Sequence, residues 1–418
     1  MMRTSDRGCR PETTPARRGV AIYLFVLVLA TILAGTGLAL VAVNRADRRV
    51  HVSVQRSLQA QYAAQAGIEA ALGYMDANAN WRSTMPNGTW FDNIAFGSGK
   101  YTVVVTDTDG RLANRDTDAA TITSTTTVGG AVSRMQVTVA PRPYTALRYA
   151  CFSQTNLDIR MNASILGPVR AHQSIDTDGN YNSEENAFFE TLQGAYVNSA
   201  ITPVRYATSS LPYPQPSLSY YLSLATPVAG IAGGTAKMSK YVLTPTTNFE
   251  SPGQANPNGI YALNAAGRDI VIEKTHIKGT LIIYNAPGNK VSIQHACWIE
   301  PAGPSYPTML IYTSGGDIDM NLDQSPLSES SDNTDYNEDG DKTDTFPTLI
   351  RGVVWTQGSY VQLHMSTATL TGCLIGGSIK VHEQAVVNDD PSLAQQVMPG
   401  FVDPDMKIVA GTWREVQP

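Results

Sequence analysis

The chain has 418 residues and a formal net charge of −6, with 16% charged and 8% aromatic residues. This length allows two or three domains, and the 34 glycines and 24 prolines favour turn-rich β structure over a helical bundle. Residues 1–56 carry nine arginines against three acids, a local charge of +6, so the remainder carries −12. No basic patch with interleaved aromatic residues occurs in the sequence, so nucleic acid is not expected as a partner.

A basic leader precedes a long apolar run near the N-terminus. Arg17, Arg18 and Gly19 are followed by Val20–Val43, which contains no Lys, Arg, Asp or Glu. A helix rises about 1.5 Å per residue, so this run can cross a hydrocarbon core about 30 Å thick. Secretory signals have shorter apolar cores of about 7 to 15 residues. The run therefore predicts a single membrane-spanning helix, with residues 1–19 as a leader ahead of it.

The helix is expected to continue beyond the apolar run and to cover residues 20–80. No proline occurs between Ala16 and Met85. Apolar residues in the second half recur every three or four positions, which is the spacing of one helical face. They are Val50, Val54, Leu58, Tyr62, Ile68, Leu72 and Met75.

A short basic leader ending in glycine, followed by such a helix, resembles the type IV pilin class. The segment Leu58–Leu72 is similar to the helix of PilX-type minor pilins and K-type minor pseudopilins. The resemblance implies cleavage after Gly19, which makes Val20 the new N-terminus, and implies other pilin or pseudopilin subunits as partners. The small residues of the segment would permit close packing against neighbouring helices. An ordinary single-pass anchor is the alternative.

The resemblance has one departure with a functional meaning. Leu24 stands where major pilins carry a glutamate that helps to insert subunits into the fibre. Its absence favours a tip, minor or accessory role. The resemblance, rather than the distribution of arginines, places the N-terminus in the cytoplasm. It implies a protein of the cytoplasmic (inner) membrane with its body in the periplasm, at the cell surface or on a pilus.

Residues 81–143 are expected to form a small antiparallel β unit packed on the helix. Tyr101–Thr106, Ala120–Val128 and Arg134–Val139 are rich in β-branched residues. Turn signals separate them, including the pair Gly129 and Gly130, as in an antiparallel meander.

Residues 144–418 predict a mainly β domain. Short alternating strands separated by Gly, Asn and Asp recur along it, the pattern of a parallel β-solenoid, with a β-sandwich as the alternative. Ile277–Ile282 and Leu370–Ile375 are two similar copies with a glycine corner. The tract resembles bactofilin-like β-helical domains. Residues 200–256 are Pro- and Tyr-rich and residues 324–346 are Ser- and Asp-rich, so both are expected as excursions. The fold class is therefore α+β.

Catalysis is not expected. Asp317 and Asp319 would lie about 6.5 Å apart on one strand face, a separation that suits glycoside hydrolysis, but the alternation turns them toward solvent. His276, His295, His364 and His382 lie at dispersed positions and show no metal-ligand spacing. Cys151, Cys297 and Cys373 are widely spaced and are expected as buried thiols, with at most one disulfide. A membrane-anchored polysaccharide-acting enzyme is the alternative.

Two acidic stretches are candidate calcium loops. Asp335, Asn337, Asp339 and Gly340 match positions 1, 3, 5 and 6 of an EF-hand-type loop, with Asp341 or Asp344 in place of the missing closing glutamate. Ser174, Asp176, Asp178, Gly179 and Glu185 form a weaker match. Either stretch is also compatible with a solvated acidic turn. Structural Ca²⁺ is the one cofactor considered.

Together these features predict a non-enzymatic minor pilin or pseudopilin-like component of a type IV pilus or type II secretion assembly. It would display a β-rich domain outside the cytoplasm, where surface polysaccharide is a candidate ligand. A structural adhesin outside any fibre is a further alternative.

Overall fold

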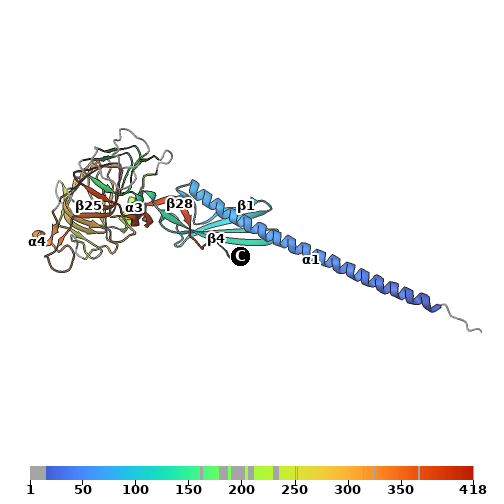
Figure 1. Cartoon of the computed structure of the whole chain (residues 1–418). Helices are drawn as coiled ribbons and strands as arrows, with labels where there is room; N and C mark the ends of the chain where they lie inside the picture. Colours follow the sequence, from blue (N-terminus) through green and yellow to red (C-terminus); the bar gives the residue numbers. More distant parts are fainter. Residues whose placement is uncertain are drawn as a thin grey trace, which may run out of the picture.

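The computed structural model describes residues 16–160, 163–177, 187–189, 203–205, 211–228, 235–249, 251, 253–313, 315–323, 325–365 and 368–417. Helix α1 (Ala16–Ala77) extends from a small sheet, and a larger β domain lies at the far end of that sheet (Figure 1). We call the small sheet with the part of α1 that packs on it the stem, and the larger domain, residues 151–388, the head. The fold is α+β, which confirms the prediction.

Helix α1 is continuous, as the sequence predicts, and is followed by the short helix α2 (Trp81–Thr84). Its 62 residues span about 93 Å at 1.5 Å per residue. Gly67 lies at the closest approach of helix to sheet, because a Cβ atom there would come within 3.0 Å of the Ser124 hydroxyl. The residues of α1 buried on the sheet are Ala60, Ala63, Ala64, Ile68, Ala71 and Met75. These small residues of the segment 58–72 therefore pack on the chain's own sheet, and packing of the segment against helices of other subunits stays a prediction.

The stem sheet is antiparallel in the order β1-β2-β3-β4-β28, with β29 also paired to β4. The meander expected within residues 81–143 is confirmed by the first four strands, whose inward residues include Val103, Ile122 and Val137. The strands are β1 (Gly88–Phe96), β2 (Gly99–Asp107), β3 (Ala120–Val128), β4 (Ala131–Pro143), β28 (Val402–Ile408) and β29 (Arg414–Glu415).

The last two strands depart from the expected division of the chain. The sequence analysis placed residues 144–418 in the solenoid-like domain, whereas β28 and β29 return to the stem and pair with β4. The head is therefore an insertion between β4 and β28. β28 gives little signal in the sequence, because Met406 is its one buried residue.

The head is a parallel β-solenoid, which confirms the first of the two architectures considered. Strands of successive coils pair in parallel register, and inward aliphatic residues such as Ile272, Ile293 and Met320 stack in its core. The strands are β5 (Cys151–Ser153), β6 (Asn156–Ile159), β7 (Ser164–Leu166), β8 (Val169–Ala171), β9 (Ser174–Thr177), β10 (Ala187–Phe189), β11 (Pro203–Arg205), β12 (Thr226–Pro227), β13 (Ala236–Ser239), β14 (Val242–Leu243), β15 (Ile260–Asn264), β16 (Ile270–Lys278), β17 (Thr280–Tyr284), β18 (Val291–Glu300), β19 (Met309–Ile311), β20 (Asp317–Leu322), β23 (Leu349–Thr356), β24 (Tyr360–Met365), β25 (Thr369–Gly376), β26 (Ser378–His382) and β27 (Val386–Asn388).

The coils of the head do not stack in chain order. Its first strands, β5, β6 and β7, pair with its last strands, β25, β26 and β27. The chain therefore enters the stack in its middle. β8 and β9 continue the stack on one side of the entry point, and β12–β24 build it on the other.

Glycine corners allow the coils to approach closely. Gly279 lies against Gly259, and a Cβ atom at Gly279 would fall inside 3.0 Å of the Gly259 carbonyl oxygen. Gly372 lies in register with Gly352 and has the same relation to it. These glycines are the corners of the two similar copies that the sequence analysis singled out.

The two expected excursions behave differently. Part of residues 200–256 joins the solenoid as β12, β13 and β14, because Ala236, Met238 and Leu243 point into its core. Another part, including α3 (Leu218–Leu224), packs on the outer face of one side, where Tyr221 is buried. Of the second excursion, residues 325–346 leave the coil as a hairpin of β21 (Leu327–Ser328) and β22 (Thr345–Phe346), with α4 (Glu329–Asp332) between them.

Two segments connect stem and head, residues 144–150 and 389–401, and we call them the neck. They contain the 3-10 helices η1 (Thr145–Arg148) and η2 (Pro391–Gln395). The Asp403 carboxylate, at the start of β28, holds the first segment, since it accepts hydrogen bonds from the Thr145 backbone N–H (2.9 Å) and hydroxyl (2.7 Å). The buried Phe401 accepts a further bond from the Tyr144 N–H.

Candidate functional site

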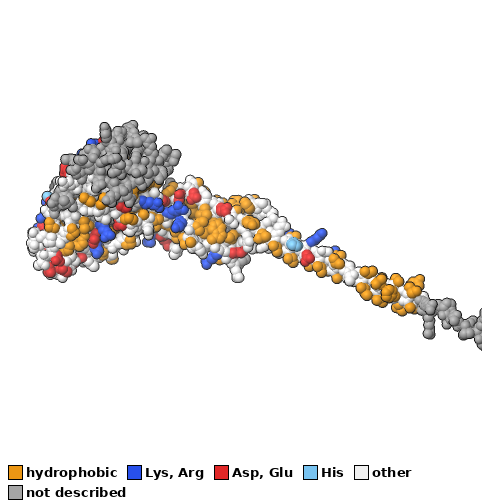
Figure 2. Space-filling view, in the orientation of Figure 1, with side chains coloured by type: hydrophobic (Ala, Val, Ile, Leu, Met, Phe, Trp, Pro, Cys, Tyr) orange, Lys and Arg blue, Asp and Glu red, His pale blue; other side chains and the backbone are white. Residues whose placement is uncertain are grey.

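The N-terminal part of α1 has no cover within the molecule. In the part of the chain that the structure describes, one helix is long and apolar enough to cross a membrane, and its most apolar window lies wholly unburied. Figure 2 shows apolar side chains over this end of the helix. Because exposure of so many apolar side chains to water is unfavourable, this segment requires lipid or other protein around it.

The predicted cleavage site lies inside this exposed helix. Gly19 and Val20 both belong to α1 and are exposed. Apart from the chain neighbours and the local helix backbone, no atom lies within 4 Å of the place where a Cβ on Gly19 would be. Removal of residues 1–19 stays a prediction.

An apolar stripe continues along α1 beyond the membrane-length segment. Val50, Val54, Leu58 and Tyr62 are all exposed. Leu58 and Tyr62 lie on the side of α1 away from Ala60 and Ala64, because residues two apart on a helix of 3.6 residues per turn point about 160° away from each other and residues six apart about 120°. The periodicity found in the sequence therefore marks an unpartnered face in this region and a buried face only from Ile68 onward.

Arginines lie where the helix meets the stem. Arg48, Arg49 and Arg56 line a shallow groove together with the glycine pair of the β3–β4 turn. Arg56 donates a hydrogen bond from Nη1 to the Gly129 carbonyl oxygen at 3.2 Å. Such a basic belt next to an apolar helix suits the phosphate-rich boundary of a membrane.

The acidic loop, residues 329–344, lies at the end of the head remote from α1, where acidic side chains gather on the surface (Figures 1 and 2). Both carboxylate oxygens of Asp335 are used within the turn. They accept hydrogen bonds from the backbone N–H groups of Glu338 (2.6 Å) and Gly340 (2.9 Å). Asn337 donates its amide to Asp339 (2.9 Å) and to Asp344 (2.8 Å). The carboxylates of the loop thus converge around Asn337.

Glu329 is the member of this group that the sequence analysis missed. One ligand oxygen each from Glu329, Asp341 and Asp344 lies within 4.8 Å of the others. Glu329 is fully buried and accepts from the backbone N–H groups of Tyr336, Asn337 and Asp344. It precedes the EF-hand-like motif in the sequence, so a search forward from Asp335 for a closing acid does not find it.

The charges in the loop repel one another. The pKa of Asp344 lies above its usual value because the group is partly desolvated and because Asp339, Asp341 and Glu329 are close. The pKa of Asp339 lies below its usual value because it accepts from the Asp341 N–H and from the Asn337 amide. A hard cation among these oxygens would relieve the repulsion, and Ca²⁺ accepts six to eight oxygen ligands.

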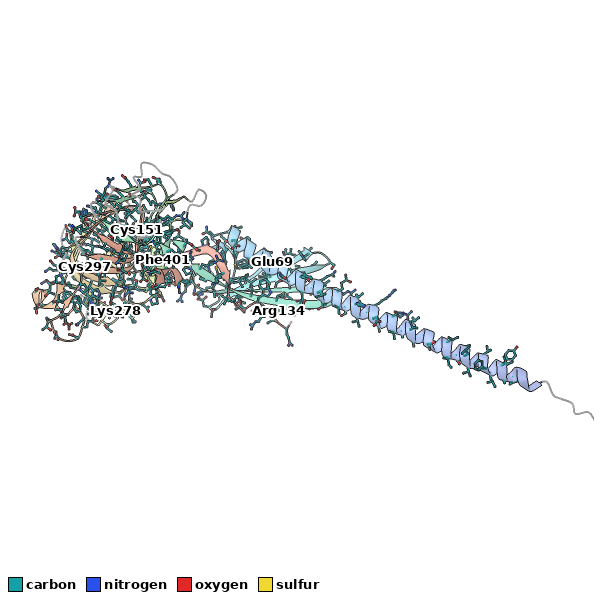
Figure 3. All side chains as sticks on the ribbon, in the orientation of Figure 1. Glu69, Arg134, Cys151, Lys278, Cys297 and Phe401 are labelled. Atoms are coloured by element: carbon teal, nitrogen blue, oxygen red, sulfur yellow. The ribbon has the colours of Figure 1, made fainter. Side chains whose placement is uncertain are left out.

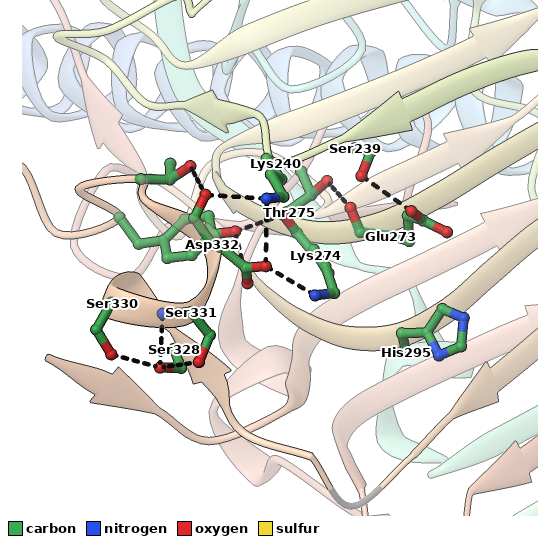
Figure 4. A network of polar contacts seen from close by, with 12 residues as sticks. Ser239, Lys240, Glu273, Lys274, Thr275, His295, Ser328, Ser330, Ser331 and Asp332 are labelled. Carbon is green, nitrogen blue, oxygen red and sulfur yellow. Dashed lines mark hydrogen bonds and ion pairs between the residues drawn. The ribbon is translucent and has the colours of Figure 1, made fainter. Parts of the chain in front are cut away.

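A polar network holds the acidic loop on the head (Figure 4). The nearly buried Asp332 forms ion pairs with Lys274 (2.7 Å) and Lys240 (3.7 Å). Tyr336 is fully buried and donates its hydroxyl to the Lys274 carbonyl oxygen. Phe346 stacks on Trp298 with ring centroids 4.6 Å apart. The base of the loop is therefore fixed even though its tip is exposed.

The second candidate calcium loop is only partly described. Ser174 and Asp176 lie on strand β9, where Asp176 accepts from Arg160 at 2.6 Å and Ser174 donates to Asn156. Asp178, Gly179 and Glu185 lie outside the described residues. Cation binding by this stretch stays a prediction.

The carboxylates considered for catalysis lie as the strand alternation predicts, and the cysteines lie where buried structural thiols were expected. Asp317 is exposed and Asp319 is half-buried, while Ile318 and Met320 point inward. Cys151, Cys297 and Cys373 are buried free thiols, as expected, and two of them are marked within the head in Figure 3. Burial raises the pKa of Cys151 and of Cys297 to about 12, so neither is a nucleophile near neutral pH.

The sequence matches no protein-family model and no curated protein. Among solved structures, the fold is similar to the competence-associated pilin ComZ from Thermus thermophilus, with 14% identity and a TM-score of 0.37 over 86% of this chain and 98% of that one. It is also similar to a glycosylated ice-binding protein from an Arctic yeast, with 12% identity and a TM-score of 0.29 over 60% of this chain and 94% of that one. Likenesses this weak assign no function, and the resemblance to PilX-type and bactofilin-like proteins stays a prediction.

Proposed function

We propose that this protein is a non-enzymatic minor pilin or pseudopilin-like component of a type IV pilus or type II secretion assembly. The observation that carries the proposal is the division of α1, whose N-terminal part is apolar and uncovered while its C-terminal part packs on the stem sheet. Before assembly the uncovered part would lie in the cytoplasmic membrane, with stem and head outside the cytoplasm.

The exposed stripe supports partners of the same kind. Val50, Val54, Leu58 and Tyr62 extend past the length that a bilayer core of about 30 Å covers when Val20 begins the span. An apolar face above the lipid remains unfavourable in a lone subunit. Parallel packing against the helices of other subunits would bury this apolar face. An ordinary single-pass anchor requires no apolar face beyond the lipid.

The experiment is the N-terminal analysis of the full chain in a host that has a prepilin peptidase. Mass spectrometry is expected to find Val20 at the N-terminus, and the variant Gly19→Leu is expected to keep its leader. The same cells are then sheared. The mature parent protein is expected in the fibre fraction, and Gly19→Leu is expected to be absent from it. Gly35→Leu, at a site that is equally open, is the matched control.

Three other results would replace the proposal. An intact leader in the parent chain would leave an ordinary single-pass anchor. Correct processing without any protein in the fibre fraction would favour a structural adhesin outside a fibre. Turnover of acidic or neutral polysaccharides that Asp319→Asn abolishes would favour the enzyme. A polysaccharide ligand stays a prediction.

We also propose that the acidic loop binds structural Ca²⁺, which Glu329, Asp341 and Asp344 support by their mutual approach. Ligand binding to the folded state alone would stabilise it by about 2.7 kcal/mol at a hundredfold excess over Kd. The melting temperature of the full chain in detergent is expected to fall when Ca²⁺ is replaced by a chelator. Glu329→Gln is expected to abolish that difference, and Asp405→Asn, an exposed acid in the stem, to preserve it. An unchanged melt in the parent chain would leave the loop a solvated turn.

A further inference from the structure

Two histidines lie side by side on the outer face of the head. Strands β24 and β26 pair in parallel register, with His364 opposite His382. Each follows a fully buried inward residue, Leu363 or Val381, so each points to the outer side of the coil. The two imidazole Nε2 atoms are 2.8 Å apart. No metal-ligand spacing is visible here in the sequence, because the two histidines are 18 residues apart, which is one turn of the solenoid.

Two carboxylates flank this pair. The Glu383 oxygens lie 3.4 Å from His364 Nδ1 and 3.6 Å from His382 Nδ1. Asp319 Oδ1 lies 3.7 Å from His364 Nε2. That oxygen is buried and has no hydrogen-bond partner in the described part of the chain, whereas Asp319 Oδ2 pairs with Lys290 at 2.8 Å.

The turn after β26 is built to bring Glu383 back over the histidines. Glu383 and Gln384 are consecutive non-glycine residues with positive φ, 57° and 64°. Such conformations are unfavourable for residues with a Cβ atom and concentrate at sites where a side chain must be held in place. One ligand atom each from His364, His382 and Glu383 lies within 4.8 Å of the others.

The placement of the pair suits a cation. His382 is 5% exposed, and its Nε2 atom lies 2.8 Å from that of His364. Neutral imidazoles hold lone pairs, and two facing Nε2 atoms share at most one proton between them. A cation between the rings would use both lone pairs and would neutralise the carboxylates on either side.

We propose that His364 and His382 bind a divalent transition-metal ion of the Zn²⁺ class through their Nε2 atoms. Asp319 Oδ1 is the third ligand, and the Glu383 carboxylate accepts hydrogen bonds from the two Nδ1–H groups behind the rings. Carboxylates take this position behind metal-bound imidazoles, and imidazole ligands suit Zn²⁺, Cu²⁺ and Ni²⁺. Two nitrogens about 2.05 Å from a tetrahedral ion lie about 3.3 Å apart, so the Nε2 atoms need to separate by about half an ångström. The ring centroids are 3.5 Å apart, so the two rings must also swing away from each other to direct both lone pairs at one ion.

The ion would join two neighbouring coils at a particular place in the stack. β24 and β26 belong to successive coils, and the coil of β26 is the one on which β6 stacks after the chain enters the head. The site would therefore fasten the coil at which the two ends of the inserted domain meet.

The test is a calorimetric titration of the full chain in detergent with Zn²⁺, in millimolar Ca²⁺ to occupy the acidic loop. The parent is expected to bind one equivalent, and Co²⁺ in its place is expected to give the visible absorption of a nitrogen-ligated ion. His364→Ala and His382→Ala are expected to weaken Zn²⁺ binding by at least about 100-fold, and Glu383→Gln by about 10- to 100-fold. His295→Ala is the matched control, because His295 is a solvent-exposed histidine of the head away from the pair, and this variant is expected to bind as the parent does.

The melting temperature of the parent chain provides a second measurement that does not depend on any variant folding. It is expected to rise with Zn²⁺ and to return with a chelator. Absence of both the calorimetric signal and the shift in the parent would overturn the proposal. So would unchanged Zn²⁺ affinity in His364→Ala and Glu383→Gln, since it would place the ion elsewhere on the head.

Discussion

Stem and head bury their apolar side chains with opposite arrangements of the chain. In the stem, β1 to β4 are antiparallel neighbours in sequence, and a helix covers one face of their sheet. In the head, all pairings within the solenoid are parallel among the described strands, and each coil covers the next. The stem is therefore held by side chains between helix and sheet, whereas the head also depends on close contact between backbones at its corners.

The largest expected effect concerns a corner of the head. Gly279→Val would place a branched side chain against the backbone of Gly259, and backbone cannot move aside without displacing the coil. We expect a loss of about 3 kcal/mol or more in the free energy of unfolding, as for overpacking of a dense core. Denaturant unfolding of the full chain, followed by circular dichroism, measures it.

The matched control for this corner is Gly303→Ala, because Gly303 belongs to the head and has open space where its Cβ would lie. It is expected to change stability by less than about 0.5 kcal/mol. A corner variant as stable as this control would mean that backbone contact does not limit the stacking of the coils.

The helix–sheet contact of the stem should give a smaller loss. Gly67→Val would press on Ser124, Tyr101 and Val103, all of them side chains that can shift. We expect a destabilisation of about 1 to 3 kcal/mol. In the same helix, Gly73→Ala meets nothing within 4 Å and is expected to stabilise by about 0.5 to 1 kcal/mol. Effects of the same sign at both positions would contradict the packing described for α1.

The neck determines whether stem and head unfold together. Asp403→Ala removes the acceptor of two hydrogen bonds from Thr145, with an expected loss of about 1 to 3 kcal/mol for bonds to a charged group. Calorimetry is expected to separate one unfolding transition into two. Asp405→Ala, an exposed neighbour on the same strand, should leave the transition unchanged. A single transition in both variants would show that the neck couples the domains without Asp403.

The smallest effect should depend on pH and occur only in the acidic loop. Because the pKa of Asp344 is raised in the folded chain, the folded state holds its proton to higher pH, and stability falls as pH rises through that pKa. In chelator, the melting temperature of Asp344→Asn is therefore expected to be above that of the parent at pH 7. The two melting temperatures should become similar near pH 4, close to the usual pKa of aspartate, about 3.9. With Ca²⁺ the order at pH 7 should reverse. The same melts of Asp317→Asn, an exposed acid outside the loop, serve as the control.

Local patterns predicted much of this molecule. The proline-free run gave one helix, and alternation separated inward Ile318 and Met320 from outward Asp317. What depends on pairing between distant segments was not predictable in the same way. The strands of a solenoid all present similar aliphatic faces, so their sequences do not specify that β5 stacks on β25.

The candidate sites also divide into residues found from a local motif and residues brought together from distant segments. Asp341 and Asp344 belong to one local loop and were found from its spacing, whereas Glu329 joins them from the preceding helix. His364 and His382 meet only through the register of two coils. A ligand set distributed over coils has no fixed local motif, and it becomes visible once the length of one coil is known.

The insertion of the head also sets an order for biosynthesis. The outer edge of β4 stays unpaired until β28 is made. β28 begins at Val402, after the neck and the whole head, whereas β4 ends at Pro143. At about 5 to 20 residues per second, a ribosome needs on the order of ten to fifty seconds to supply it. During that interval the nascent chain carries an open sheet edge, which is a template for mispairing. Because β28 follows the head in the chain, the stem sheet can be completed only after the head has been synthesised.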